Sequence, residues 1–376
     1  MNKNKIIFFC DYGLNIGLGH LIRTISIAEI FLEIDNFEIL FLLEKSFHLP
    51  NMIKNFNCKF FEKLENIDKP FSYLLNLILE ENPKVFFIDS EIWPNMINCI
   101  SNKKIPITLL NGRISETTFN RWKNFPRFSK EIFSKLKLCF SSDSKSKSYL
   151  YKLGVKNIKT YGNLKFTQSE NENVKIDLKI RNFLKMKKVW CASSTHYPEE
   201  LLCANVHKKL VKKYKNLLTI IIPRHIERVQ KIKSDLENLG LNVCIDSSIG
   251  KINRNTDIYI VNSYGKTKSF YNICKNVFLG GSTINHGGQN PLEAARYGCE
   301  ILHGPHISNF TEIYKFLKVN NISSKIDDKN SMADKLIKLF SKKSRSVKIR
   351  SKINNIGKKV LIKTYNEIFL TFKNEI

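Results

Sequence analysis

The stretch NVFLGGSTINHGGQNPLEAARYG, residues 276–298, joins a short apolar run to a glycine-rich turn and a run of helix-forming residues. Its first four residues predict a buried strand, and the segment after Asn290 predicts a helix that ends at Gly298. Asn290 suits the N-cap, Pro291 the first helical position, and Glu293 the place from which a capping-box acid reaches back. This stretch is therefore typical of one strand–turn–helix unit of an α/β fold.

Similar apolar runs alternate with amphipathic helical stretches along the whole chain, as in βαβ units with parallel sheets. A chain of 376 residues exceeds what one hydrophobic core usually supports. We therefore expect two doubly wound domains, with the ligand cleft at the carboxyl ends of the strands and between the domains. The runs are KIIFFC (5–10), FEILFLL (37–43), KVFFID (84–89), IPITLL (105–110), LKLCFSS (136–142), KKVWCAS (187–193), LLTIIIP (217–223), DIYIVNS (257–263), NVFLGG (276–281) and CEILHG (299–304).

The formal charge of +27 suggests an anionic partner: nucleic acid, a lipid surface or a phosphorylated substrate. Of the 61 basic residues, however, 50 are Lys and only 11 are Arg, and Asn, Ile and Phe are abundant. Coding DNA rich in A and T produces the same excess of Lys, Asn, Ile and Phe, so the positive charge alone is weak support for an anionic partner. Because no groove-reading helix or stacking sheet is apparent, we expect no nucleic-acid partner.

Nine cysteines are present without a CxxC pair, which argues against a zinc site and against a disulfide framework. A reducing compartment fits this pattern. The apolar run near the N-terminus, residues 6–10, is too short for a signal peptide or a membrane span, and no other run is long enough. We therefore expect a cytoplasmic protein that meets a membrane, if at all, peripherally.

The glycine-rich turn also predicts an anion site. Gly280, Gly281 and Ser282 precede the helix, so their backbone amides could point into the cleft, near a helix N-terminus that favours phosphate. An ordinary strand–helix turn with a capped helix is the alternative. Glu293 either caps this helix or accepts hydrogen bonds from ribose hydroxyls.

Five segments, in order, resemble the 3-deoxy-D-manno-octulosonic acid (Kdo) transferases, which add Kdo to the lipid A precursor. They cover most of the chain and are more specific together than any single glycine turn. The segments are DSEIWPN (89–95), LLNGRISETTFNRW (109–122), YGNLKF (161–166), ASSTHYPEE with IIPRHIERV (192–200 and 221–229), and GGSTINHGGQNPLEAARYG followed by ILHGPHISNF (280–298 and 301–310).

The resemblance implies a GT-B glycosyltransferase whose two Rossmann-like domains face across a cleft. It further implies CMP-Kdo as donor, inversion at the anomeric carbon, no metal and no cofactor. We expect residues 1–166 to form an acceptor-binding domain, 167–185 a linker, and 186–350 a nucleotide-sugar-binding domain. Residues 351–376 would form a C-terminal helix able to pack back on the N-terminal domain.

The same resemblance implies which residues act at the site. Glu91 and Lys165 match positions that assist the transition state. Arg224 follows a strongly apolar strand, so its guanidinium can pair with phosphate or the sugar carboxylate; a surface ion pair with Glu227 is the alternative. Glu91 could also be a helix-start carboxylate, and Lys165 a solvated lysine. The residues that would hold CMP are Pro223, Arg224, Asn290, Pro291, Leu292 and Glu293, together with the glycine turn.

Two positions depart from the family pattern. The family carries its catalytic glutamate at the first strand–helix turn, where this chain has Ile-Gly-Leu-Gly-His and the glutamate position corresponds to His20. An imidazole can also take a proton from an acceptor hydroxyl. A helix cap or a packed core histidine is the alternative. At Lys266 the family has an acid that helps to bind the nucleotide, so the charge is reversed.

These departures keep other interpretations open. GLGHLIR, residues 17–23, resembles the GxGHxxR turn of other GT-B enzymes, so a transferase or hydrolase for another UDP- or CMP-linked sugar is one alternative. A catalytically inactive relative is another. Residues 121–140 are basic and aromatic, which suits peripheral contact with an anionic membrane surface, here the cytoplasmic face of the inner membrane. A helix with a solvated basic face would look the same.

Overall fold

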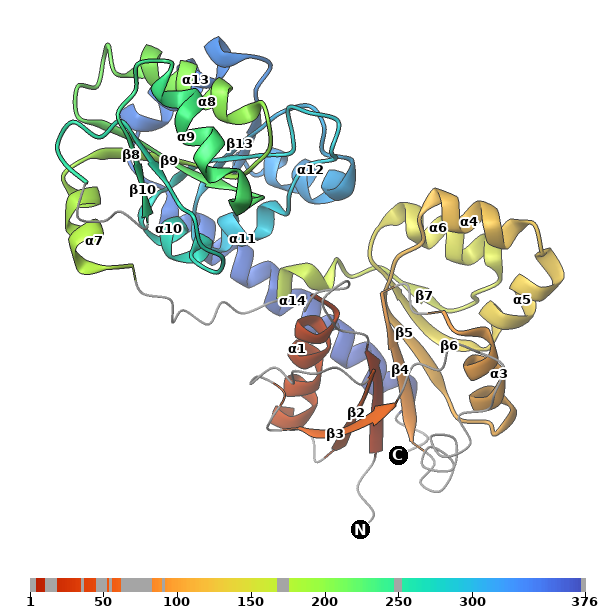
Figure 1. Ribbon diagram of the computed structural model, residues 1–376. Helices are drawn as coiled ribbons and strands as arrows, with labels where there is room; N and C mark the ends of the chain where they lie inside the picture. Colours follow the sequence, from red (N-terminus) through yellow and green to blue (C-terminus); the bar gives the residue numbers. More distant parts are fainter. Residues whose placement is uncertain are drawn as a thin grey trace. The chain divides into compact units, whose positions relative to one another are not determined.

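The computed structural model describes residues 5–10, 19–34, 37–44, 53, 56–61, 83–89, 92–167, 176–246 and 252–372. The chain divides into two compact units (Figure 1). The first comprises residues 1–169 and 355–376, and the second comprises residues 170–354. Each unit is built around one parallel sheet.

The first unit has a seven-stranded sheet in the order β3-β2-β1-β4-β5-β6-β7, with every described pairing parallel. Its strands are β1 (Lys5–Cys10), β2 (Glu38–Glu44), β3 (Asn57–Phe61), β4 (Lys84–Ile88), β5 (Ile107–Gly112), β6 (Leu136–Ser141) and β7 (Ile158–Lys159). Its helices are α1 (Gly19–Ile34), α3 (Pro94–Asn102), α4 (Glu116–Lys123), α5 (Pro126–Ser134), α6 (Ser144–Leu153), the 3₁₀ turn η2 (Leu164–Thr167), and the later part of α14 (Ser346–Phe372).

Both faces of this sheet are covered because its strands are apolar on both sides. Successive side chains of β1 point to opposite faces of the sheet and so pack in different hydrophobic cores. Phe8 packs with α1 and α14, whereas Phe9 packs with α3, α5 and α6. Figure 1 shows α1 and α3 on opposite sides of the sheet. Runs that are hydrophobic throughout are typical of such buried parallel strands.

The second unit has a seven-stranded parallel sheet in the order β10-β11-β9-β8-β12-β13-β14. Helices α8, α9 and α13 cover one face, and α10 lies on the other, where Tyr271 Oη hydrogen-bonds Ser193 Oγ at 2.8 Å. Its strands are β8 (Lys188–Thr195), β9 (Leu217–Pro223), β10 (Val243–Ile245), β11 (Ile258–Ile260), β12 (Asn276–Leu279), β13 (Glu300–His303) and β14 (Ser323–Lys325). Its helices are α7 (Leu178–Lys185), α8 (Glu199–Leu210), η3 (Ile226–Arg228), α9 (Val229–Glu237), α10 (Thr267–Ile273), α11 (Pro291–Arg296), η5 (Ser308–Phe310), α12 (Thr311–Val319) and α13 (Lys329–Ser341).

The expected α/β class with two doubly wound Rossmann-like domains is confirmed. Two predicted boundaries differ from the structure. The predicted linker 167–185 ends in helix α7, because Ile180, Phe183 and Leu184 form an apolar stripe that is buried in the second unit. The predicted terminal helix begins at Ser346 rather than at residue 351, and its Val360, Tyr365, Ile368 and Phe372 join the core of the first unit.

Candidate functional site

In the first unit, the candidate site lies where the strand order reverses. Strands β1 and β4 are neighbours, and the chain leaves β1 toward one side of the sheet and β4 toward the other. Helix α1 follows β1 in the chain, with His20 as its second residue, and Asp89 directly follows β4. Ligands of open α/β sheets bind at such a switch point, outside the carboxyl ends of the strands.

A hydrogen-bonded network surrounds the Asp89 carboxylate. Oδ2 of Asp89 lies 3.1 Å from Nε2 of His20 and accepts a hydrogen bond from Arg23, while Oδ1 accepts one from the Asn111 side chain. Oδ1 of Asn111 in turn accepts the backbone amide of Leu164 at 2.9 Å. The side chains of Arg23 and Asp89 are almost fully buried, whereas that of His20 is 19 % exposed. His20 is therefore more exposed than Arg23 and Asp89, although its Nδ1 atom is buried.

Lys165 lies beside this network, on the turn η2. Burial and, after it, the positive charges of Arg23 and Arg113 together lower the pKa of Lys165 to about 8, against the opposing attraction of Asp89. Lys165 is half-buried and lies among other cations, unlike an ordinary solvated lysine, and strongly perturbed groups concentrate at functional sites. The structure thus brings the predicted residues His20 and Lys165 to one neighbourhood through Asp89.

In the second unit, the corresponding reversal lies between β8 and β12. His196 follows β8, Arg224 follows β9, and the glycine turn follows β12, so all three are at the carboxyl edge of the sheet. Pro223 is the last residue of β9 and is buried, while Arg224 is exposed. Glu227 pairs with His225 at 3.3 Å, and the described part of the chain shows no ion pair between Glu227 and Arg224.

Three histidines gather at this edge. The ring centroid of His196 is 4.4 Å from that of His286 and 5.5 Å from that of His225. Burial lowers the pKa of His196, and His286 is the next largest cause of the decrease. His196 is therefore neutral near pH 7, with one ring nitrogen as donor and one as acceptor. Arg224 carries the permanent positive charge of the cluster.

The glycine turn is held by a buried carboxylate. Glu199, only 1 % exposed, accepts the backbone amides of Gly281, Ser282 and Thr283 at 2.7, 3.1 and 3.0 Å, and the Thr283 hydroxyl at 2.8 Å. The amide of Gly280 donates to Ser193 O at 2.8 Å. We expected these amides to point into the cleft and bind an anion. Instead they donate to groups of the chain itself, chiefly to the Glu199 carboxylate, which occupies the position that an anion would take.

Helix α11 begins as the sequence predicts. The side chain of Asn290 accepts the amide of Leu292 at 3.1 Å, and Pro291 is in the first turn. Pro291 and Leu292 are buried, whereas Glu293 is partly exposed. Asn290 and Pro291 thus fix the start of the helix, and the polar residues Asn290 and Glu293 are both partly exposed.

The predicted site residue Glu91 lies outside the described residues.

Four residues at these two edges were not among the predicted site residues, although each stands in a segment that the sequence analysis singled out. Asp89 opens DSEIWPN, Arg23 closes GLGHLIR, and His196 and Glu199 lie in ASSTHYPEE. Residue type and position at a strand end were visible in the sequence, but the partners of each side chain were not.

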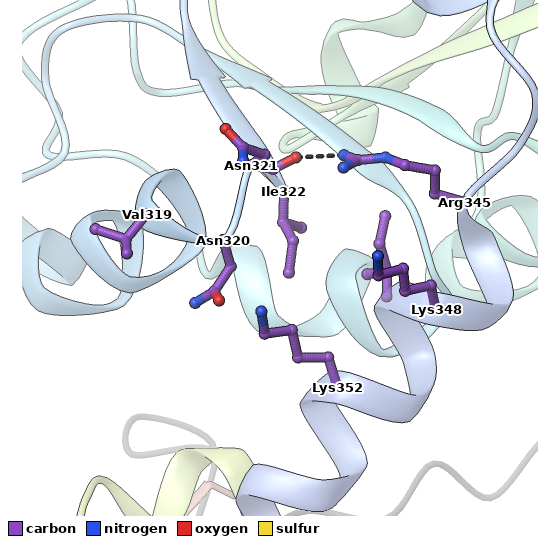
Figure 2. Close-up of a pocket in the computed structure, with 8 residues that line it drawn as sticks. Val319, Asn320, Asn321, Ile322, Arg345, Lys348 and Lys352 are labelled. Atoms are coloured by element: carbon purple, nitrogen blue, oxygen red, sulfur yellow. Dashed lines mark hydrogen bonds between the residues drawn. The ribbon is translucent and has the colours of Figure 1, made fainter.

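The second unit also contains a separate pocket of about 190 Å³, whose lining residues are drawn in Figure 2. It lies at the opposite edge of the sheet, because Ile322 precedes β14 and Arg345 pairs with Glu300 at the start of β13. Lys348 and Lys352 of α14 border it. The pocket is therefore no part of the cluster around His196.

Within the described ranges, no group of three or more His, Cys, Asp or Glu side chains is placed to hold a metal ion. Of the helices that the structure describes, none combines the length and the apolar character needed to cross a membrane.

Residues 76–168 match the family model described as 3-deoxy-D-manno-octulosonic-acid transferase (kdotransferase). The chain is 30 % identical to the 3-deoxy-D-manno-octulosonic acid transferase of Haemophilus influenzae over 305 residues, which are 79 % of this chain and 70 % of that protein. It is 32 % identical to the enzyme of the same name from Rickettsia bellii over 233 residues, 61 % of this chain and 54 % of that one.

Among solved structures, a glycosyltransferase from Rickettsia africae has a TM-score of 0.61, 12 % identity and full coverage of both chains, and it supports the fold alone. The relationship to the Haemophilus influenzae protein extends over both units. The chain belongs to the 3-deoxy-D-manno-octulosonic acid transferase family.

Proposed function

We propose that this chain, a glycosyltransferase of the Kdo family, transfers Kdo from CMP-Kdo to a lipid A precursor in lipopolysaccharide biosynthesis, with inversion and without a metal. The observation that carries the proposal is the presence of a polar cluster at the switch point of each sheet. One cluster contains the exposed cation Arg224 and suits a nucleotide sugar, and the other contains a partly exposed imidazole.

The second unit would bind the donor. CMP-Kdo carries a phosphodiester and a carboxylate, both anionic. Arg224 is the exposed cation at the end of β9 and would pair with one of them. Neutral His196 would donate a hydrogen bond, and Glu293 would accept hydrogen bonds from the ribose hydroxyls. Pro223, Asn290, Pro291 and Leu292 would shape the nucleotide site, with Gly280, Gly281 and Ser282 as the turn behind it.

The first unit would supply the chemistry. His20 takes the proton of the acceptor hydroxyl as its oxygen attacks the anomeric carbon, and CMP leaves with the electron pair of the broken bond. Lys165, while protonated, stabilises the negative charge that develops on the leaving phosphate. Glu91 would assist the transition state, as the family resemblance implies.

The test is a direct assay with CMP-Kdo generated in situ, a tetraacylated lipid A precursor and products read by mass. His20→Ala should lower turnover about 10²- to 10⁴-fold and leave CMP affinity nearly unchanged. Glu293→Ala should chiefly weaken CMP binding. Equal turnover in His20→Ala would refute the role of the imidazole, and absence of any Kdo-containing product from the wild type would refute the proposal or identify an inactive relative.

A second candidate is a transferase or hydrolase that uses another nucleotide-linked sugar. It is favoured by Lys266, because the family carries an acid at this position. Nζ of Lys266 lies 2.5 Å from Oδ2 of Asp246. The carboxylate of Asp246, which also accepts the Tyr259 hydroxyl at 2.5 Å, therefore balances the charge of Lys266 within the unit. A donor panel separates the candidates: UDP release from UDP-sugars without CMP release from CMP-Kdo would select the second.

We further propose that the protein acts peripherally on the anionic cytoplasmic face of the inner membrane, through the corner between α4 and α5. Phe125 and Phe128 are 66 % and 44 % exposed there. The exposed side chains of Arg121, Lys123 and Arg127 surround them. Exposed aromatic and basic side chains together suit an interface of anionic lipid headgroups.

A further inference from the structure

We propose that Asn111 is a positioning residue of the reaction: its side chain ties the turn η2, which carries Lys165, to the Asp89 carboxylate at the switch point of the first unit. This inference rests on the proposed function in one respect, the role of Lys165 at the leaving phosphate. The contacts of Asn111 lie within the first unit, and their effect on Lys165 can be measured without any substrate.

The Asn111 side chain uses both of its polar atoms in long-range hydrogen bonds. Its Nδ2 donates to Oδ1 of Asp89, and its Oδ1 accepts the backbone amide of Leu164, the first residue of η2, at 2.9 Å. All three residues are buried, so water competes little for these bonds. One amide at the end of β5 therefore joins the residue after β4 to the turn that carries Lys165.

The backbone at position 111 limits the residue types that could make this bridge. Asn111 is left-handed, with φ 53°, a conformation that glycine, asparagine and aspartate adopt more readily than other residues. Glycine has no side chain, and an ionised aspartate can only accept hydrogen bonds and would repel Asp89. Asparagine is the one of the three that donates to a carboxylate and also accepts a backbone amide. The residue type thus fits the bridge as well as the backbone.

The turn η2 is held by further contacts. Within the turn, Oδ1 of Asn163 accepts the backbone amide of Lys165 at 2.8 Å. Helix α14 approaches the turn so closely that a Cβ at Gly357 would collide with the carbonyl oxygen of Phe166. Asn111 adds a bond from the edge of the sheet. The position of the turn is therefore defined by two elements that are distant in the sequence, β5 and α14.

The position of the turn determines the charges that Lys165 meets. Burial and the cations Arg23 and Arg113 disfavour its charged form, whereas Asp89 favours it. The attraction depends on distance, and the Asn111 bridge holds Asp89 and the turn together. Lys165 is thereby poorly hydrated but, with a pKa of about 8, still a cation at pH 7. Such a pre-organised cation is suited to a negative charge that develops during the reaction.

A purely structural role for Asn111 makes a different prediction. In that case its amide would only satisfy the buried Asp89 carboxylate and the Leu164 N–H, and its loss would lower the free energy of unfolding. The folded variant would then turn over substrate, and Lys165 would titrate, as in the wild type. Loss of a positioning residue instead lowers kcat more than it raises KM, and it changes the surroundings of Lys165.

The experiment compares Asn111→Gly with Asn321→Gly, because Asn321 is an exposed asparagine of the second unit that is also left-handed, with φ 54°. Glycine accepts this backbone conformation, so both variants lose the side chain alone. Asn111→Gly should lower kcat about 10- to 100-fold and change KM for CMP-Kdo by less than about threefold. Asn321→Gly should change neither.

The second measurement is an NMR titration of the protein without substrate, with carbon-13 in the lysine Cε atoms and the Lys165 signal assigned with Lys165→Arg. In Asn111→Gly the pKa of Lys165 should rise from about 8 toward 10.5, because a released turn lets water reach the ammonium group and burial is the largest cause of the lowered value. In Asn321→Gly it should not move.

A folded Asn111→Gly variant with unchanged kcat, or with a Lys165 pKa that stays or falls, would overturn the inference. The titration requires no turnover, so it still decides the positioning if the proposed reaction fails. Should Asn111→Gly not fold, Asn111→Asp has the same shape and can still accept the Leu164 amide, so it should retain at least about a tenth of kcat. A larger loss in a folded Asn111→Asp variant would show that the bond to the turn does not position Lys165.

Discussion

The carboxylate of Glu199, at the start of α8, accepts the backbone amide of Gly281 at 2.7 Å from the turn after β12. Its two oxygens also accept the amides of His196, Ser282 and Thr283. The first residue of the helix that follows β8 therefore fixes the turn that follows the neighbouring strand β12. The candidate nucleotide edge is pre-organised by this contact before any ligand arrives.

Replacement of Glu199 by Gln should destabilise the second unit. The amide group of Gln would direct its own donors at backbone donors, and we expect a loss of about 2–4 kcal/mol in the free energy of unfolding. Urea unfolding measures it. Glu237→Gln is the matched control, because Glu237 is exposed and pairs with Lys233 at 3.6 Å on the surface of α9; it should change stability by less than about 0.5 kcal/mol. Equal effects in the two variants would contradict the role of Glu199.

Arg224→Ala should weaken CMP binding about 10- to 100-fold and leave the melting temperature nearly unchanged. The guanidinium is exposed, so its loss removes a charge-assisted contact with the ligand and little packing. Isothermal titration with CMP measures the affinity. Arg254→Ala, at another exposed arginine of the same unit, controls for the loss of one positive charge. If both variants bind CMP equally well, Arg224 is not part of the nucleotide site.

Lys165 should make turnover sensitive to alkaline pH. Its pKa is lowered to about 8, so it is a cation below this pH and loses its charge above it. If the cation stabilises the leaving phosphate, kcat falls as the pH rises through about 8. In Lys165→Arg this alkaline decrease should disappear, since an arginine keeps its charge. A wild-type profile that stays flat from pH 7 to 9.5 would argue against the assigned role.

The same lowered pKa has an opposite consequence for stability. The folded protein binds the Lys165 proton more weakly than the unfolded chain, in which the pKa is near 10.5. The unfolded state therefore holds more protons between about pH 8 and 10.5, and this group makes the fold more stable as the pH rises through that window. Lys165→Met should abolish the contribution, raise stability at pH 7 and lower turnover. Thermal unfolding of the wild type and of Lys165→Met at several pH values measures the rise in stability with pH and its loss in the variant.

The double variant Phe125→Ser and Phe128→Ser should reduce binding to vesicles that contain phosphatidylglycerol. The two rings are exposed at the corner of α4 and α5, so their removal should cost interfacial affinity and little stability. Co-sedimentation with vesicles measures it. Leu370→Ser, at an equally exposed apolar residue of α14, is the control. Unchanged sedimentation of the double variant would exclude this corner as the membrane contact.

The sequence by itself determined the fold class and the residue types at the sheet edges. Ten short apolar runs predicted the central strands, because a strand buried on both faces is hydrophobic throughout. The edge strands β3, β7, β10 and β14 were not predicted. β14 has the sequence SSK, and such an edge strand buries too little surface to leave a hydrophobic signal.

Only the tertiary structure decided which partners these residues have. Asp89 and His20 are far apart in the sequence, and Glu199 and Gly281 are 82 residues apart, yet each pair is in contact. Parallel topology brings the ends of non-consecutive strands together, and hydropathy along the chain carries no record of that pairing. The glycine turn shows the consequence: its composition indicated free amides for an anion, and the fold supplies a carboxylate of its own to the amides of Gly281, Ser282 and Thr283.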